Sequence, residues 1–178
     1  MKGAANTMLN PKIEKAFNEQ INAETYSSYL YLSMAAWFDN QQLAGFAHWM
    51  KIQALEEMTH ALRFYNYIHD RGGKVSLKPV AGPPANWQSP LNAFEEVLKH
   101  ELLVTGLINK LVGLARKEND YASDNYLQWF VKEQVEEEAS AEDVIGKLKM
   151  INQTEGGLFL LDKDLSARVF TMPIDVRL

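Results

Sequence analysis

The sequence predicts an all-α protein: a four-helix bundle with one long crossover between the second and third helices, and a short fifth helix near the C-terminus. Two long stretches almost free of glycine and proline flank a short stretch that is rich in both. Within the long stretches, apolar residues recur at steps of three and four, the period of a helix with one buried face. Strand-like alternation of useful length is absent from the sequence. These three features favour helices throughout.

The first half of the chain predicts two helices, at residues 11–39 and 42–71. This half contains no proline between residues 12 and 68, and its only glycine there is Gly45. The polar segment 39–41 interrupts the apolar periodicity with residues that favour turns. Because a joint of a few residues brings consecutive helices side by side, we expect these two helices to be antiparallel.

The second half predicts two more antiparallel helices, at residues 91–118 and 121–153. The turn-prone pair Asn119-Asp120 separates them, and the double glycine at 156–157 ends the fourth helix. A short fifth helix is expected from Leu158 to Arg168.

The connection between the two halves, residues 72–90, concentrates glycine and proline in nineteen positions. It therefore reads as an extended segment. Such a segment can reach roughly 60 Å, whereas a helix of thirty residues is about 45 Å long. The connection can run the whole length of the bundle, so the second and third helices are predicted to be parallel.

Composition excludes several classes of protein. The chain has 178 residues with 23 acidic and 18 basic side chains, a formal charge of −5, which argues against a nucleic-acid-binding protein. It has no cysteine, which excludes disulfides, zinc fingers, iron–sulfur clusters and thiolate nucleophiles. Met1–Thr7 lacks the apolar region of a secretory signal, and the longest mostly apolar stretch, Tyr29–Phe38, is too short to span a bilayer. We expect a soluble cytoplasmic protein that binds neither nucleic acid nor membrane.

The apolar stripe of every long helix is interrupted by a carboxylate, and none of the four stripes contains a lysine or an arginine. The interruptions are regularly spaced, because 33 residues separate both Glu24 from Glu57 and Glu101 from Gln134. Each second member is followed three residues later by another candidate ligand, His60 or Glu137. The midpoints of the pairs 24–57 and 101–137 fall at the predicted turns, so all six side chains are expected at one level inside the bundle.

Electrostatics indicates what this level contains. Burying four ionised carboxylates without a cationic partner would cost too much free energy for a stable fold, because each buried charge costs several kcal/mol even after relaxation. Two divalent cations would neutralise them, and carboxylates with one imidazole and no thiolate suit iron, manganese or zinc. A lone Glu in a stripe more often turns to solvent or pairs with a lysine, and a lone His is more often a core residue. Six such positions in register favour a dinuclear metal site.

Four stretches carry a family resemblance: Gln20–Glu24, Tyr29–Ala35, Glu56–Ala61 and Phe130–Glu138. Through them the chain resembles the bacterial and archaeal non-haem ferritins over roughly residues 8–172. Ferritin-like folds are themselves a standard example of a one-crossover bundle with a di-iron carboxylate site. The departure from the symmetric di-iron pattern is that Gln134 and Glu137 replace a second Glu-x-x-His. The resemblance implies an N-terminal extension at 1–7, expected to be disordered, a ferritin-like domain at 8–172 and a C-terminal tail at 173–178.

The resemblance also implies the activity. Ferritins of this kind are ferroxidases, which oxidise Fe(II) with O2 or H2O2 and store the ferric mineral inside a shell of twenty-four subunits. The short fifth helix of the family points at the four-fold axes of that shell. By position, Glu24, Glu57 and His60 match the family's ligands of the first iron, and Glu57 matches the ligand that bridges the two irons. Glu101, Gln134 and Glu137 match the ligands of the second iron.

Further roles follow from the same resemblance. Tyr31 matches a tyrosine beside the site, where it can hydrogen-bond a ligand or donate an electron, and its alternative role is that of a buried core aromatic. Trp129 is a weaker candidate for electron donation. Asp120 and Asp124 are suggested as pore residues. The third iron site of prokaryotic ferritins matches Glu56, Glu133 and Glu136, which could instead form a solvated helix face.

Three other functions are weighed against ferritin. A haem-containing bacterioferritin would use Met58, which follows Glu57 where bacterioferritins carry their haem ligand. A di-iron oxidase or oxygenase would need a cavity for an organic substrate and usually has two Glu-x-x-His motifs. In a purely structural bundle, the common level of the buried acids would be a coincidence. The preferred oxidant, the metal present on isolation and the partner for iron release stay open.

Overall fold

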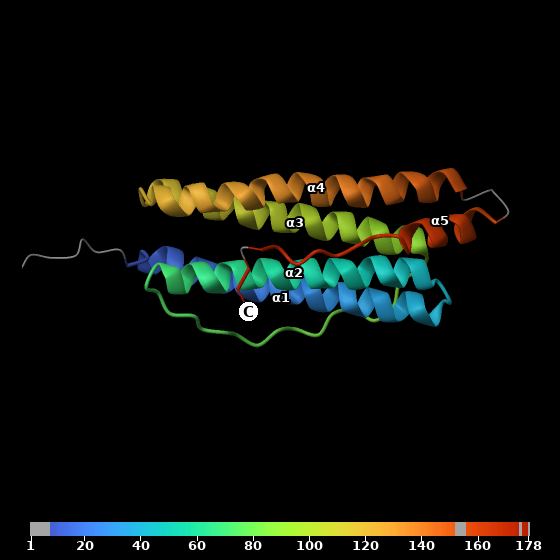
Figure 1. The fold of residues 1–178 in the computed structure, drawn as a ribbon, viewed down its shortest axis with the longest axis horizontal. Helices are drawn as coiled ribbons and strands as arrows, with labels where there is room; N and C mark the ends of the chain where they lie inside the picture. Colours follow the sequence, from blue (N-terminus) through green and yellow to red (C-terminus); the bar gives the residue numbers. More distant parts are fainter. Residues whose placement is uncertain (1–7, 152–155, 175, 178) are drawn as a thin grey trace, which may run out of the picture.

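The computed structural model describes residues 8–151, 156–174, 176 and 177. Figure 1 shows a bundle of long helices with a short helix at one end, and the described residues contain no strand. The all-α prediction is therefore confirmed. The N-terminal extension and the last two residues of the predicted fourth helix, 152 and 153, lie outside the described residues. The helices are α1 (Pro11–Asn40), α2 (Ala44–Asp70), α3 (Pro90–Lys117), α4 (Tyr121–Ile151) and α5 (Gly157–Leu165).

The helices pair within each half of the chain. Helices α1 and α2 lie side by side and antiparallel, as do α3 and α4 (Figure 1). The crossover runs the length of the α1–α2 pair and returns the chain to the end where α2 began, which makes α2 and α3 parallel, as predicted. Three side chains of α1 hold it through its carbonyl oxygens: Asn18 donates to Lys74 at 3.0 Å, Asn22 to Pro79 at 3.0 Å and Ser33 to Pro84 at 2.6 Å.

Local sequence explains where the long helices begin and turn. The Asn10 side chain accepts from the backbone N–H of Lys12 ahead of Pro11, and the Ser89 side chain accepts from Asn92 ahead of Pro90. Both are polar caps followed by a proline whose fixed φ suits the first turn of a helix. The α3–α4 turn uses Asn119 at φ 54°, a left-handed conformation that Asn adopts more readily than most residues. Where the predicted ends of the four long helices fall on described residues, they agree with the structure to within two residues.

Two aromatic-rich cores fill the bundle, one on each side of a polar layer. The core at the α1–α2 turn includes Phe38 stacked on Phe46 at 5.1 Å. The core at the opposite end includes Phe64 stacked on Phe130 at 4.3 Å. Packing on both sides keeps water away from the polar layer between them. None of the described helices is long and apolar enough to cross a membrane, and the cytoplasmic location stays a prediction.

Helix α5 docks on the start of α2. Asp162 Oδ1 accepts hydrogen bonds from the backbone N–H groups of Gly45 and Phe46, at 2.8 and 3.0 Å. Helix α2 has no side-chain cap of its own at Leu43, so Asp162 satisfies two of its unpaired N–H donors. A Cβ on Gly45 would lie 1.6 Å from the Asp162 carbonyl oxygen. This contact explains the only glycine between residues 12 and 68.

The predicted end of the fifth helix is wrong. The helix begins at Gly157, one residue before its predicted start, and ends at Leu165, three residues before Arg168. The Ser166 hydroxyl donates to the carbonyl oxygen of Lys163 at 2.7 Å and so competes with helical hydrogen bonding at the last turn. The carbonyl oxygen of Arg168 lies 2.8 Å from Nε2 of His48 on α2. This contact with a distant helix draws the chain out of the helical path.

Candidate metal centre

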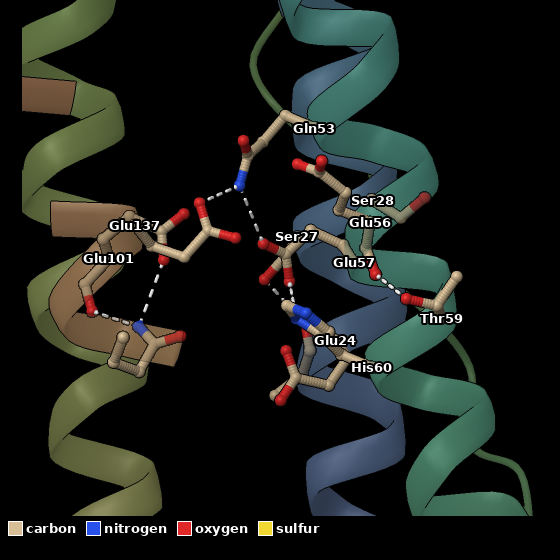
Figure 2. Close-up of polar contacts among 12 residues, drawn as sticks. Glu24, Ser27, Ser28, Gln53, Glu56, Glu57, Thr59, His60, Glu101 and Glu137 are labelled. Carbon is tan, nitrogen blue, oxygen red and sulfur yellow. Dashed lines mark hydrogen bonds and ion pairs between the residues drawn. The ribbon is translucent and has the colours of Figure 1, made fainter. Parts of the chain in front are cut away.

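The structure brings the six predicted ligands into the polar layer between the two cores. Glu24 lies on α1, Glu57 and His60 on α2, Glu101 on α3, and Gln134 and Glu137 on α4. Figure 2 shows Glu24, Glu57 and His60 on one side of the layer, with Glu101 and Glu137 on the other. All six side chains are buried. Their residue exposures are 1% for Glu24, Glu57 and Glu101, 3% for His60, 4% for Gln134 and 6% for Glu137.

The α1–α2 side of the layer offers a compact group of ligand atoms. One atom each from Glu24, Glu57 and His60 lies within 4.8 Å of the other two. Nδ1 of His60 is 3.5 Å from Oε2 of Glu57. Oε2 of Glu24 and Oε2 of Glu57 are buried and accept no hydrogen bond. Because a buried polar atom normally has a partner, these two oxygens fit a bound cation.

On the α3–α4 side, both carboxylate oxygens of Glu101 accept hydrogen bonds. Oε1 of Glu101 accepts from the Tyr31 hydroxyl, and its Oε2 accepts from Nε2 of Gln134 at 3.2 Å. Glu137 shares a second group of possible ligands, within 4.8 Å, with His60 and Glu133. The assignment of Glu101, Gln134 and Glu137 to one second cation therefore stays a prediction.

Burial shifts the acids of the layer toward their protonated forms. Desolvation, followed by the charge of Glu57, raises the pKa of Glu24 to about 8. Desolvation, followed by the charge of Glu101, raises the pKa of Glu137 to about 7. Burial also raises the pKa of Glu101, and it raises the pKa of Glu57 well above its usual value. Near neutral pH a cation must therefore displace protons from this layer, so binding releases protons.

Two glutamines complete the layer, and sequence reasoning did not select either as a site residue. Nε2 of Gln20 donates to Oε1 of Glu24 at 2.9 Å. Nε2 of Gln53 donates to Oε1 of Glu57 at 3.3 Å and to Oε2 of Glu137 at 2.6 Å (Figure 2). Each glutamine precedes a glutamate of its own helix by four residues, and the two are themselves 33 residues apart. This repeated Gln-x-x-x-Glu spacing is the signal that could have identified them.

Tyr31 donates to Glu101 directly, whereas Thr105 contacts Gln134, the other side chain that donates to Glu101. Tyr31 is fully buried, and desolvation with the charge of Glu101 raises its pKa well above 10, so the phenol stays protonated and donates. Thr105 accepts from Nε2 of Gln134 at 3.3 Å and donates to Glu138. No motif marked Thr105 in the sequence, because its role depends on how α3 packs on α4.

The family is decided by comparison with known proteins. A model of the ferritin-like domain family matches residues 14–151. The chain belongs to the ferritin family. It is 44% identical over 161 residues to a bacterial non-heme ferritin of Bacteroides fragilis, covering 90% of this chain and all of that protein. It is 40% identical over 159 residues to a bacterial non-heme ferritin of Escherichia coli, covering 89% and 96%.

Solved structures agree with this assignment. A crystal structure of an open pore ferritin from Archaeoglobus fulgidus superimposes with a TM-score of 0.90 at 50% identity, covering 92% of this chain and 99% of that one. The ferritin-like bundle with its long crossover and short fifth helix is thereby confirmed.

In this ferritin Glu56, Glu133 and Glu136, the carboxylates predicted for a third cation, are not among the described groups whose ligand atoms all lie within 4.8 Å of one another. Glu133 joins the group with His60 and Glu137. Glu136 is exposed and pairs with Lys132 at 3.4 Å. Glu56 forms an ion pair with Arg168. The third site therefore stays a prediction, and two of its three members hold a cationic side chain instead.

The remaining candidates lie at the edges of the centre or away from it. The Trp129 ring meets the His60 ring edge-on at 5.4 Å, and the guanidinium of Arg63 covers its face at 3.8 Å. Met58 is 40% exposed on α2. The suggested pore residues pair at the start of α4, Asp120 with Arg71 at 3.1 Å and Asp124 with Arg116 at 3.0 Å.

Proposed function

We propose that this ferritin stores iron, and that it oxidises Fe(II) at the buried carboxylate layer before the ferric product is stored. One observation carries the proposal: four glutamates and a histidine are buried together, and no lysine or arginine is buried among residues 8–151, 156–174, 176 and 177. Two divalent cations match the formal charge of four ionised glutamates. The curated relatives named above are non-heme ferritins, which supports iron as the metal.

Glu24, Glu57 and His60 would hold the first Fe(II), with Glu101, Gln134 and Glu137 toward the second and Glu57 between them. The unpartnered oxygens of Glu24 and Glu57 support this arrangement, because each can bind a cation without first losing a hydrogen bond. Carboxylates and imidazole are suitable ligands for iron. Hydrogen bonds from Gln20, Gln53 and Tyr31 position the carboxylates.

The reaction consumes two Fe(II) and one oxidant. Each Fe(II) loses one electron, and O2 takes both electrons with two protons to give H2O2. With H2O2 as the oxidant, the O–O bond breaks and two electrons with two protons give two molecules of water. The layer can release protons, because its glutamates have raised pKa values in the metal-free protein. Two Fe(III) leave for storage.

The shell is proposed to contain twenty-four subunits, with α5 at its four-fold axes. The fold similarity to the Archaeoglobus fulgidus ferritin supports this assembly. Size-exclusion chromatography tests it directly, because a shell elutes hundreds of kilodaltons above a monomer or dimer of a 20.3 kDa chain. Elution as a monomer would contradict the shell without contradicting the oxidation.

Oxidation is tested by adding Fe(II) in air and following near-ultraviolet absorbance from ferric iron. We expect the wild type to be far faster than buffer, and Glu57→Ala to lose most of that rate while the shell still assembles. Glu142→Ala is the matched control, because Glu142 is exposed on α4 and belongs to none of the predicted iron sites, so we expect the rapid phase to stay intact. A wild-type rate equal to that of buffer would refute the ferroxidase activity.

A further inference from the structure

The C-terminal arm, which we define as residues 166–174, 176 and 177, runs along the outside of α2 (Figure 1, red). An arginine anchors it near each end. Arg177 Nη2 lies 2.7 Å from both carboxylate oxygens of Asp70, and its carbonyl oxygen accepts from Asn66 at 3.0 Å. Between the anchors, Val169 and Ile174 are largely exposed, and Val176 is buried. Polar contacts at the two ends therefore contribute much of the attachment.

The anchor at Arg168 lies beside the metal centre. Its guanidinium binds Oε2 of Glu56 and covers the face of Trp49, with 4.3 Å between the guanidinium carbon and the ring centroid. The side chains of Arg168 and Glu56 are only 21% and 26% exposed. The Arg168 carbonyl oxygen is held by His48 at 2.8 Å. Aromatic and carboxylate contacts together fix the guanidinium in one orientation.

Glu56 stands next to a residue of the proposed iron site. It precedes Glu57 in α2, and it was predicted from the family resemblance to bind a third cation. A carboxylate oxygen that accepts from a guanidinium cannot at the same time ligate a metal ion along that direction. The positive charge of Arg168 also opposes a second cation on the same carboxylate.

We propose that Arg168 is an internal cation that occupies Glu56 and competes with divalent cations for this carboxylate. The inference rests on the proposed function, since it concerns cations that reach the same centre. A divalent cation that binds Glu56 must displace the guanidinium. By linkage, a cation on Glu56 weakens the anchor at Arg168 by the same factor that the anchor weakens the cation. Arg177 keeps the other end of the arm attached.

The competition is tested by calorimetric titration of the assembled protein with Zn(II), which is redox-inert. We define the Glu56-dependent Zn(II) as the binding lost in Glu56→Gln. In Arg168→Met, this Zn(II) is expected to bind about tenfold more tightly, within the usual range of coupling between sites. In the double variant Arg168→Met with Glu56→Gln, the gain is expected to vanish.

Arg177→Met is the matched control, because it removes the same charge from the same arm but its partner is Asp70. We expect its Zn(II) affinity to equal that of the wild type. Equal tightening in Arg177→Met would overturn the inference in favour of a general charge effect. Unchanged affinity in Arg168→Met, or a gain that persists without Glu56, would overturn it too.

Displacement of the arm is tested separately with a spin label. The chain contains no cysteine, so Val169→Cys provides a unique labelling site next to Arg168. We expect Zn(II) to increase label mobility, and we expect Glu56→Gln to show the mobile spectrum already without metal. Label mobility that changes neither with Zn(II) nor with Glu56→Gln would overturn the proposed displacement of the arm. If the wild type bound no Zn(II) at all, the proposed iron site would fail, which is distinct from a failure at Arg168 alone.

Discussion

The two halves of the bundle share a 33-residue spacing, from Glu24 to Glu57 and from Glu101 to Gln134, but support their glutamates differently. In the α1–α2 half, Gln20 and Gln53 each donate to a glutamate on their own helix, one turn away. In the α3–α4 half, the residue one turn before Glu101 is the buried, apolar Val97. Glu101 accepts one hydrogen bond within its own half, from Gln134. Glu101 and Glu137 also take donors from the opposite half, from Tyr31 and Gln53.

This difference indicates how the centre forms. The α1–α2 half carries a complete cation-binding group in Glu24, Glu57 and His60, two of whose oxygens are free. The geometry of the α3–α4 half depends on how the halves pack, because two of its donors, Tyr31 and Gln53, belong to the other half. We therefore expect the first cation to depend on α1–α2 alone and the second to depend on the contact between the halves.

The largest effect is expected from removing a ligand of the α1–α2 group. His60→Ala should weaken the tightest Zn(II) by more than about 100-fold, since even residues that only orient a ligand contribute 10- to 100-fold. Glu101→Ala should leave that tightest Zn(II) nearly unchanged and weaken the second. Calorimetric titration measures both. If Glu101→Ala weakens binding of the tightest Zn(II) as much as His60→Ala does, the first cation does not depend on the α1–α2 half alone.

Next in size is the pH dependence of the metal-free protein. The folded-state pKa values of Glu24, about 8, and Glu137, about 7, lie above the ordinary value of 4.5, so the folded protein holds more protons than the unfolded chain. The free energy of unfolding therefore falls as pH rises through this window. The penalty is absent below about pH 4.5 and complete above about pH 8, and it amounts to a few kcal/mol.

Chemical denaturation with a chelator present measures this pH dependence. The control is the same series with saturating Zn(II), where the cations neutralise the layer and release its protons. We expect the loss of stability between pH 5 and pH 8 to shrink or disappear there. A metal-free stability that rises across the same window would contradict the protonated state of the layer.

A smaller effect is expected from the glutamine that joins the halves. Gln53→Met keeps the length of the side chain but leaves Glu137 and Glu57 each without one donor, at a cost of about 1–3 kcal/mol. Gln20→Met is the matched control, because it removes one donor from Glu24 alone. We expect Gln53→Met to be the more destabilising in denaturation of the metal-free protein. Equal losses would mean that Gln53 does not couple α2 to α4.

The smallest effect is expected within the α3–α4 half. Thr105→Val removes a hydroxyl that accepts from Gln134 and donates to Glu138, at a cost of about 0.5–1.5 kcal/mol. Gln134 keeps its contact with Glu101, so Fe(II) oxidation should change less than twofold. Stopped-flow absorbance and denaturation midpoints measure the two effects. A collapse of the oxidation rate would show that Thr105 positions Gln134 for the chemistry.

Helix periodicity explains which features of the site could be predicted from the sequence alone. A helix advances by a constant rise and angle for each residue, so the common 33-residue spacing placed Glu24, Glu57, Glu101 and Gln134 at one level. The short turns and the long crossover determined which helices neighbour one another. The absence of lysine and arginine from the stripes indicated that cations or protons must balance the acids. These inferences use only local geometry and charge.

Contacts between distant segments could not be read in this way. Gln53 reaches Glu137, Arg168 leaves the fifth helix to bind Glu56, and Asp162 caps α2 at Gly45. Each contact depends on side-chain rotamers and on how closely two helices approach, which residue spacing does not specify. The sequence by itself determined the helices, their order and the level of the acids. Only the tertiary structure decided which donor faces which carboxylate, because those partners meet after the bundle has packed.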